Sequence, residues 1–559
     1  MSSVIKKYWI YLAVALLVAL SCLVFGESES RSDSHFWRMW LSVLTGSFIV
    51  IRLLATKFIS LKNELIKQIA KHIYLSILLA ATIAGIFNYY QFDKKWTTGL
   101  DDYTDIAYYY LNTKYLDELG YMGFYAAMLT ADKEYKNRHA TRIHHYRDLR
   151  DYNIKSTKIA FEHGQEVKKN FTPQRWEQFK KDCDYFMERK TLFGLKRAFF
   201  VDHGYNPPPT WAVPGFILTS LADVEYIKII AMVDILFVAA MFAVVAWAFG
   251  FEVMIYLALF FFCTFSGRWP VLSHSLLRFD WSATLIMGIA FMKKEHYITS
   301  GVMMGYAALT RIFPAIFFFP WLVYIVWKLL KDHRIPMEQW RFTFGAAVAT
   351  IVLVASALIL FGTGHMKESA RNLIMHNNSY SSQRVGLGDL FVWEGETTQK
   401  EIIANGSLIV KEKKIQSLKS TFWFFGIGTM LLIALYIIRT KRPVWELIHF
   451  AAIPMFCVTN AQMNYYNLRM VLIIWHTSQM TKRPFYHGLG MVMLMTTEVL
   501  GHLYLLDKHP RYVVTTVTSI CLAIYYSIMM IWMLAEIVKT FLPKESRPIK
   551  TASPAHAAG

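Results

Sequence analysis

The stretch YITSGVMMGYAALTRIFPAIFFFPWLVYIVW (297–327) decides the fold class of this chain. It is almost entirely apolar, but Arg311 interrupts it and Pro314 follows three residues later. Proline removes a backbone N–H donor and kinks or ends a helix. Broken helices at membrane depth are tolerated only where they are buried in protein or line a cavity. We therefore predict a helical hairpin whose turn, at residues 311–314, points towards the outer half of a membrane bundle.

The composition of the whole chain is that of a polytopic membrane protein. Of its 559 residues, 55% are hydrophobic, 16% are aromatic and only 18% are charged, against about 25% charged in an average soluble domain. The net charge is +19, but the basic residues lie mainly in short loops between apolar segments. That distribution is the positive-inside pattern of membrane proteins. We therefore expect the lipid bilayer as a partner, and no nucleic acid.

The apolar runs predict an all-α polytopic bundle of roughly 13 transmembrane segments. The first run, after Lys6 and Lys7, is long enough to remain as a signal anchor. Loop charges place the large loop after residue 91 outside the cytoplasm. The predicted divisions are N-terminal transmembrane segments (1–91), a large extracytoplasmic helical loop (92–212), a transmembrane core with broken helices (213–362), an extracytoplasmic loop (363–418), C-terminal transmembrane segments (419–540) and a cytoplasmic basic tail (541–559).

An acidic motif begins the large loop. TTGLDDYTDIAYYYLNTKY (97–115) places Asp101, Asp102 and Asp105 directly after a predicted membrane segment. A helix start with acidic capping residues explains them without chemistry. A general base that takes a proton from a sugar hydroxyl explains them equally well. Further along, YMGFYAAMLTAD (121–132) has apolar residues at helical spacing, and we predict a helix lying on the membrane face.

Other ionisable residues map to the same predicted outer mouth of the bundle. Such groups are costly near apolar segments and face a cavity or a partner, and arginine suits bidentate phosphate recognition. Several of these residues also have an explanation without substrate binding. Arg278 and Asp280 can form a structural pair, Arg311 can snorkel to the interface, and His376 can be an ordinary loop residue. The candidate substrate-binding residues are His203, Tyr205, Arg268, Arg278, Asp280, Arg311, His376 and Arg384.

Several signatures are missing from the sequence. It contains no Walker loop, no GxGxxG, no HExxH and no CxxC, so it indicates no P-loop, dinucleotide or zinc chemistry. We expect no metal site and no cofactor, and leave a requirement for a divalent cation open. Asp234 and Glu498 lie inside apolar segments, where they are either hydrogen-bonded buried acids or members of a proton relay.

The order of these features resembles the GT-C class of integral-membrane glycosyltransferases. Residues 300–325 are similar to a stretch of bacterial polyprenyl-phosphate-mannose-dependent α-mannosyltransferases. LLRFDW (276–281), GYNPPPTW (204–211) and HNNSYSSQRVGL (376–387) are similar to further blocks of a bacterial branch. The resemblance implies a polyprenyl-phosphate sugar donor and an essential carboxylate, which carries over to Asp101 or Asp102. The unusually long first loop departs from the family pattern.

The function we expect is transfer of a sugar, with mannose as one candidate, from a polyprenyl-phosphate donor to a glycan, lipid or protein acceptor. The site would face outward from a bacterial inner membrane, and Arg278, Arg311 and Arg384 would hold the phosphate. The alternative is a transporter or flippase of a lipid-linked or anionic solute, whose charges would follow a path across the bilayer. A structural assembly subunit, the third class, would have no charged cavity.

Overall fold

The computed structural model describes residues 31–58, 64–90, 103–267, 276–378, 383–405, 407–459 and 461–541. This part of the chain is almost entirely helical, with four strands of two or three residues, so the all-α prediction is confirmed. Eight of the described helices are long and apolar enough to cross a membrane. The protein is therefore a multi-pass integral membrane protein. The predicted signal anchor and most of the basic tail lie outside the described residues.

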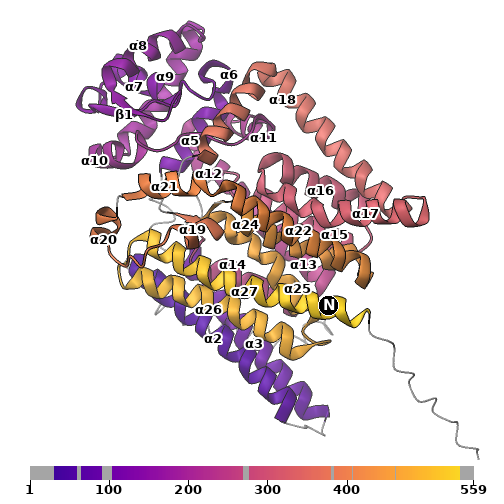
Figure 1. The fold of residues 1–559 in the computed structure, drawn as a ribbon. Helices are drawn as coiled ribbons and strands as arrows, with labels where there is room; N and C mark the ends of the chain where they lie inside the picture. Colours follow the sequence, from indigo (N-terminus) through magenta and orange to yellow (C-terminus); the bar gives the residue numbers. More distant parts are fainter. Residues whose placement is uncertain are drawn as a thin grey trace, which may run out of the picture.

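Most of the long helices pack side by side in one bundle (Figure 1). Their mutual contacts bury a large apolar core, while many apolar side chains on their outer faces stay exposed, as expected for helices in lipid. The helices of this bundle are α2 (Arg31–Phe58), α3 (Glu64–Tyr90), α13 (Val233–Phe249), α14 (Phe251–Cys263), α15 (Asp280–Lys293), α16 (Tyr297–Thr310), α17 (Phe319–Asp332), the first part of α18 (Met337–Asn378), α22 (Lys419–Thr440), α24 (Ala452–Val458), α25 (Met470–Gln479), α26 (Pro484–Leu506) and α27 (Arg511–Lys539).

The predicted break at residues 311–314 is present. Helix α16 ends at Thr310, Arg311 has extended backbone (φ −145°, ψ 142°), and a 3₁₀ turn (Phe313–Phe318) leads into α17. Helix α16 packs closely on α18 through glycine, since a Cβ at Gly345 would lie 2.0 Å from the carbonyl oxygen of Ile298. Small residues allow such close backbone approach between helices in a membrane. The end of α16 is thus held firmly in the bundle.

Helix α18 carries the chain from the bundle to a second body. At Gly362 the backbone has φ 72° inside the helix, a conformation that glycine adopts without strain. Beyond this kink the helix contacts residues of the N-terminal half: the Glu368 carboxylate accepts a hydrogen bond from the Tyr121 N–H (3.1 Å). The kink therefore brings residues 363–378 out of the bundle and onto its neighbour (Figure 1).

The second body, residues 103–220, is called the cap here. Thr172 accepts a hydrogen bond from the Arg175 N–H (3.3 Å) with Pro173 at the first helical position, so the predicted helix start at 172–173 is present. A hairpin of β1 (His145–Arg147) and β2 (Ile154–Ser156) joins two of its helices. The helices of the cap are α5 (Tyr103–Lys114), α6 (Leu116–Leu119), α7 (Phe124–Tyr135), α8 (Thr157–Lys168), α9 (Pro173–Glu188), α10 (Leu192–Gly194) and α11 (Pro209–Ser220).

The prediction that residues 121–132 form a helix on the membrane face was wrong. Every residue of α7 from Phe124 to Asp132 is buried. Phe124 and Tyr125 pack against Phe199 within the cap, with ring centroids 6.0 and 5.8 Å apart. The aromatic residues that suggested a membrane-facing side form the core of the cap instead.

Candidate functional site

A cavity of about 380 Å³ lies between the cap and the bundle. Its lining comes from segments far apart in the sequence, which only the tertiary fold brings together. Four of the predicted site residues line it: Asp105, His203, Arg278 and His376. Asp101, Asp102 and Arg268 lie outside the described residues. Tyr205, Asp280, Arg311 and Arg384 are described but lie behind the cavity wall, in the interior of the protein.

An ion pair joins the cap to the bundle at this cavity. Asp105, in the first turn of α5, accepts a hydrogen bond from Nη2 of Arg278 at 2.9 Å. Arg278 also donates to the Tyr109 hydroxyl, and its guanidinium carbon lies 4.7 Å from the centroid of that ring. Because both partners are largely buried, this contact is more than a screened surface pair. It fixes the start of α5, with Asp105, beside the bundle.

Asp234 holds the backbone from which Arg278 projects. Its Oδ1 accepts hydrogen bonds from the N–H groups of Arg278 (2.8 Å) and Phe279 (2.9 Å). The preceding Leu277 has φ 51°, a conformation that costs a non-glycine residue about 1 kcal/mol or more. The structure places Asp234 as a buried hydrogen-bonded acid that positions Arg278.

Two histidines form another wall of the cavity. The rings of His203 and His376 lie 5.7 Å apart, and Nε2 of His376 lies 3.2 Å from Nδ2 of Asn206. Burial, together with the nearby charges of Arg147 and Arg384, lowers the pKa of His203 to about 3. His203 is therefore neutral near pH 7 and offers one donor and one acceptor. Neutral imidazole is suited to binding hydroxyl groups.

The GYNPPPTW segment forms a stiff turn, because proline fixes φ, and that turn positions the histidine wall. Gly204 has φ 70°, and the Pro207 carbonyl accepts a hydrogen bond from the Tyr121 hydroxyl (2.7 Å). Asn372 of α18 donates to the Tyr205 carbonyl (2.9 Å). The Tyr205 side chain, expected to bind substrate, is 1% exposed and belongs to the interior of the cap. The residues of this segment that line the cavity are Gly204 and Asn206.

Behind Tyr109 lies an inner chamber with Asp280 and Arg311. Asp280 is fully buried and accepts a hydrogen bond from the Tyr306 hydroxyl (2.8 Å). Arg311 is 5% exposed, and its guanidinium carbon lies 4.7 Å from the Trp211 ring and 5.9 Å from the Tyr109 ring. Arg311 thus lies one aromatic side chain away from the cavity wall.

Hydrogen bonding in this inner chamber is incomplete. Nη2 of Arg311 and Oδ1 of Asp280 are buried and have no hydrogen-bond partner, although Nη1 of Arg311 donates to the Thr310 carbonyl (3.0 Å). Within the described ranges, no carboxylate lies within ion-pair distance of Arg311, and Asp280 interacts with it electrostatically from farther away. Removing an unpaired charge from water costs several kcal/mol. A native protein tolerates such a cation where an anionic ligand reaches it.

Arg384 supports the cavity from a short strand pair. Strand β3 (Arg384–Val385) pairs with β4 (Ala461–Gln462), and Nη2 of Arg384 donates to the His376 carbonyl (3.2 Å). This pairing brings Gln462 of β4, and Gln383 directly before β3, to the cavity lining. The structure therefore assigns Arg384 a positioning role in addition to its charge.

Sequence reasoning missed several lining residues. Asn206 was visible inside GYNPPPTW, and Gln462 and Tyr465 lie in the short linker that separates two apolar segments. Arg511 is the first residue of α27, and apart from its charge nothing in the sequence indicated that it lines the cavity. These residues add amide, phenol and guanidinium groups, which are typical ligands of a sugar phosphate.

Within the part of the chain that the structure describes, no group of three or more His, Cys, Asp or Glu side chains is arranged to hold a metal ion. Comparison with known proteins found no matching family model, curated protein or solved structure.

Proposed function

We propose that this protein is a GT-C-type glycosyltransferase that moves a sugar from a polyprenyl-phosphate donor to a glycan, lipid or protein acceptor. The observation that carries the proposal is the combination of the cavity with the inner chamber. A carboxylate–arginine pair and neutral histidines line a space of about 380 Å³, and a buried arginine without a carboxylate partner lies behind one tyrosine. This is the chemistry that a sugar phosphate requires.

The general base in this proposal is Asp101 or Asp102. Asp105 is engaged by Arg278 at 2.9 Å, and a nearby cation disfavours the proton-accepting behaviour of a carboxylate. Asp102 directly precedes α5, which begins at Tyr103. The Asp105–Arg278 pair then acts as the anchor that holds the acidic motif against the bundle.

Arg311 is the phosphate ligand in this proposal. Its planar guanidinium matches a phosphate, and a bound phosphate would provide the missing partner of Nη2. As the glycosyl–phosphate bond breaks, negative charge grows on the leaving phosphate and a preorganised cation stabilises it. His203, His376 and Asn206 would hold hydroxyl groups of the sugar, because the neutral groups they offer both donate and accept.

The cap would face the periplasm of a bacterial inner membrane. The last turns of α2, α15, α17 and α27 carry Lys57, Lys293, Lys331 and Lys539. Basic residues beside membrane segments favour the cytoplasmic side, and Figure 1 places the cap at the other end of α2 and α17. A bundle of roughly 13 segments, with shorter helices such as α14 crossing inside it, completes this topology.

The test is sugar transfer by the purified protein in nanodiscs with a panel of polyprenyl-phosphate sugars, followed as release of polyprenyl phosphate. We expect turnover with at least one donor, and loss of about 10³-fold or more in either Asp101→Asn or Asp102→Asn. Asp151→Asn, an exposed acid of the cap paired with Lys155, is the matched control. Full activity in both single variants would exclude this mechanism.

One observation favours the alternative, a transporter or flippase. Arg469 and Glu498 form an ion pair at 2.5 Å inside the bundle, each 1% exposed. On the same helix α26, 11 residues earlier and about 16 Å along the axis, the His487 Nδ1 lies 3.1 Å from the His476 Nδ1. Ionisable groups spaced through a bundle are typical of ion-coupled transport. Movement of an intact lipid-linked sugar across a proteoliposome, without bond cleavage, would establish this alternative.

A further inference from the structure

One segment of the cap combines an exposed aromatic side chain with several cations. Residues 190–197, KTLFGLKR, are called the basic tip here and include α10 and the start of a π-helical turn (Leu195–Phe199). Phe193 is 72% exposed, the largest value among the large apolar side chains described in the cap. Lys196 and Arg197 are exposed beside it. An exposed aromatic residue surrounded by cations is typical of contact with phospholipid headgroups.

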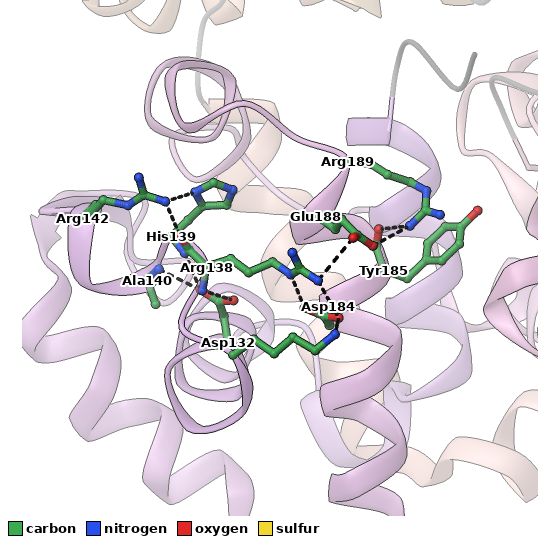
Figure 2. A network of polar contacts seen from close by, with 10 residues as sticks. Asp132, Arg138, His139, Ala140, Arg142, Asp184, Tyr185, Glu188 and Arg189 are labelled. Atoms are coloured by element: carbon green, nitrogen blue, oxygen red, sulfur yellow. Dashed lines mark hydrogen bonds and ion pairs between the residues drawn. The ribbon is translucent and has the colours of Figure 1, made fainter. Parts of the chain in front are cut away.

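The basic tip projects from a rigid base. It follows the end of α9. The Asp184 carboxylate on α9 forms ion pairs with Lys136 (2.7 Å) and Arg138, which come directly after α7. Figure 2 shows Arg138 between Asp184 and Glu188, with Arg189 folded back on Tyr185. Because this base is fixed, Phe193 is presented outward rather than folded into the cap.

The end of α9 lies beside the start of a membrane span. Tyr185, Glu188 and Arg189 line a groove of about 960 Å³ together with residues 223–225 and Lys228. The candidate span Val224–Phe249 begins in that segment. The basic tip therefore leaves the cap at the level where the chain enters the bilayer.

On its other side the basic tip borders the cavity. Arg197 and Ala198 line the same space as Arg278 and Tyr465. The segment thus extends from the bilayer boundary to the mouth of the cavity. A lipid phosphate at the headgroup level would be within reach of the same cations that line the cavity entrance.

We infer that the basic tip docks on the bilayer surface, with Phe193 among the headgroups and Lys196 and Arg197 against lipid phosphates. The occupant is anionic phospholipid, because cations attract negative headgroups over about a Debye length while the aromatic side chain enters the interface. The contact would keep the cavity mouth at the membrane surface. It goes beyond the proposed function, since a transporter of lipid-linked solutes would use it equally.

The test measures the depth of residue 193 in nanodiscs. Phe193→Cys is labelled with an environment-sensitive fluorophore, and the discs contain phosphatidylglycerol, phosphatidylcholine and a lipid with a nitroxide headgroup. The described cysteines are buried or half-buried, and the parent protein treated with the same dye gives the background. Lys158→Cys on α8, at the end of the cap remote from the bundle (Figure 1), is the matched control.

We expect quenching at position 193 to exceed quenching at position 158 at least threefold. Replacing phosphatidylglycerol by phosphatidylcholine, or adding Lys190→Gln and Lys196→Gln, should reduce it about twofold. Equal quenching at positions 193 and 158 would overturn the inference. So would quenching at position 193 that stays the same when the anionic lipid is replaced and when the lysines are substituted. The quenching experiment needs no sugar donor. A negative result would therefore count against docking of the basic tip and would leave the proposed glycosyltransferase activity to its own test.

Discussion

Two ion pairs in this protein have the same chemistry and different surroundings. Arg469 and Glu498 are each 1% exposed, and Glu498 also accepts from the Thr264 hydroxyl (2.7 Å) and the Phe265 N–H (2.9 Å). Asp105 and Arg278 retain 15% and 8% exposure and line a cavity. The Arg469–Glu498 pair, called the inner pair here, is enclosed by protein groups that bind it. The Asp105–Arg278 pair, called the outer pair, faces a cavity that a ligand can enter. Burial of charge therefore accompanies a structural ion pair in one region and the proposed binding site in the other.

The inner chamber sharpens this comparison. Arg311 is as deeply buried as a structural arginine, at 5% exposure, but Nη2 has no partner. Arg469 differs from Arg311 in having an ion-pair partner, Glu498 at 2.5 Å, although its Nη1 also makes no hydrogen bond. A buried cation with a free donor next to a cavity is instead prepared for an anion.

Breaking the inner pair should have the largest effect on stability. Arg469→Met leaves Glu498 buried without its cation, which we expect to lower the free energy of unfolding by about 3–5 kcal/mol. Thermal unfolding in detergent measures it. Adding Glu498→Leu should recover part of the loss, because the unpaired charge is then gone. A single variant as stable as the parent would contradict the structural role of this pair.

Asp105→Asn should have an intermediate effect. The variant keeps the shape but loses the charge that meets Arg278, and we expect a loss of about 1.5–3 kcal/mol. Hydrogen exchange of α5 reports the loosening of its first turn directly. Asp117→Asn in the same half of the cap, with its 74% exposed side chain, should change exchange little. Unchanged exchange in Asp105→Asn would remove the anchoring role.

The pH dependence of the cap should show an effect of His203 that is smaller per pH unit. Its pKa falls from 6.5 to about 3 on folding, so between these values the unfolded chain binds more protons than the native one. Stability should therefore decrease as the pH falls from about 6.5 towards 3, by at most about 1.4 kcal/mol per pH unit for one proton. His203→Gln should flatten this slope, whereas His145→Gln, at an exposed position, should not. Equal slopes would contradict the neutral buried imidazole.

Arg311→Met should have the smallest effect on stability, and in the opposite direction. Removing a buried cation without a carboxylate partner should leave the free energy of unfolding unchanged or raise it by about 1 kcal/mol. Binding of polyprenyl phosphate should fall at least tenfold, because the ligand loses its charge-assisted hydrogen bonds. Binding to nanodiscs and thermal unfolding, measured on one preparation, separate the two effects. A large loss of stability would make Arg311 a structural residue.

Much of the bundle could be predicted from the sequence, because hydropathy and breaker residues act locally. The interruption at Arg311 and Pro314 identified the end of α16, and the prolines of GYNPPPTW identified the stiff turn. The core of the cap could not be read in this way. Residues 121–132 have a pattern that suits a membrane surface equally well, and only their packing against Phe199 shows that they are buried.

The cavity was harder to predict than the helices. Asp105 and Arg278 are 173 positions apart in the chain, and their contact depends on Asp234 and on the turn at Leu277. Their charge made them candidates, but charge alone gave Asp280 and Arg311 the same standing. The structure places those two side chains in the interior. Position relative to the cavity, which no local pattern encodes, makes this distinction.

The most direct test of the central claim is the accessibility of the cavity to a reagent that cannot cross the membrane. Gln462→Cys places a thiol in the cavity lining, and a membrane-impermeant maleimide is applied to right-side-out vesicles. The account predicts rapid labelling from outside that slows at least fivefold when a polyprenyl-phosphate sugar is present. Labelling only after the cytoplasmic side is opened, or labelling that the lipid donor does not slow, would contradict it.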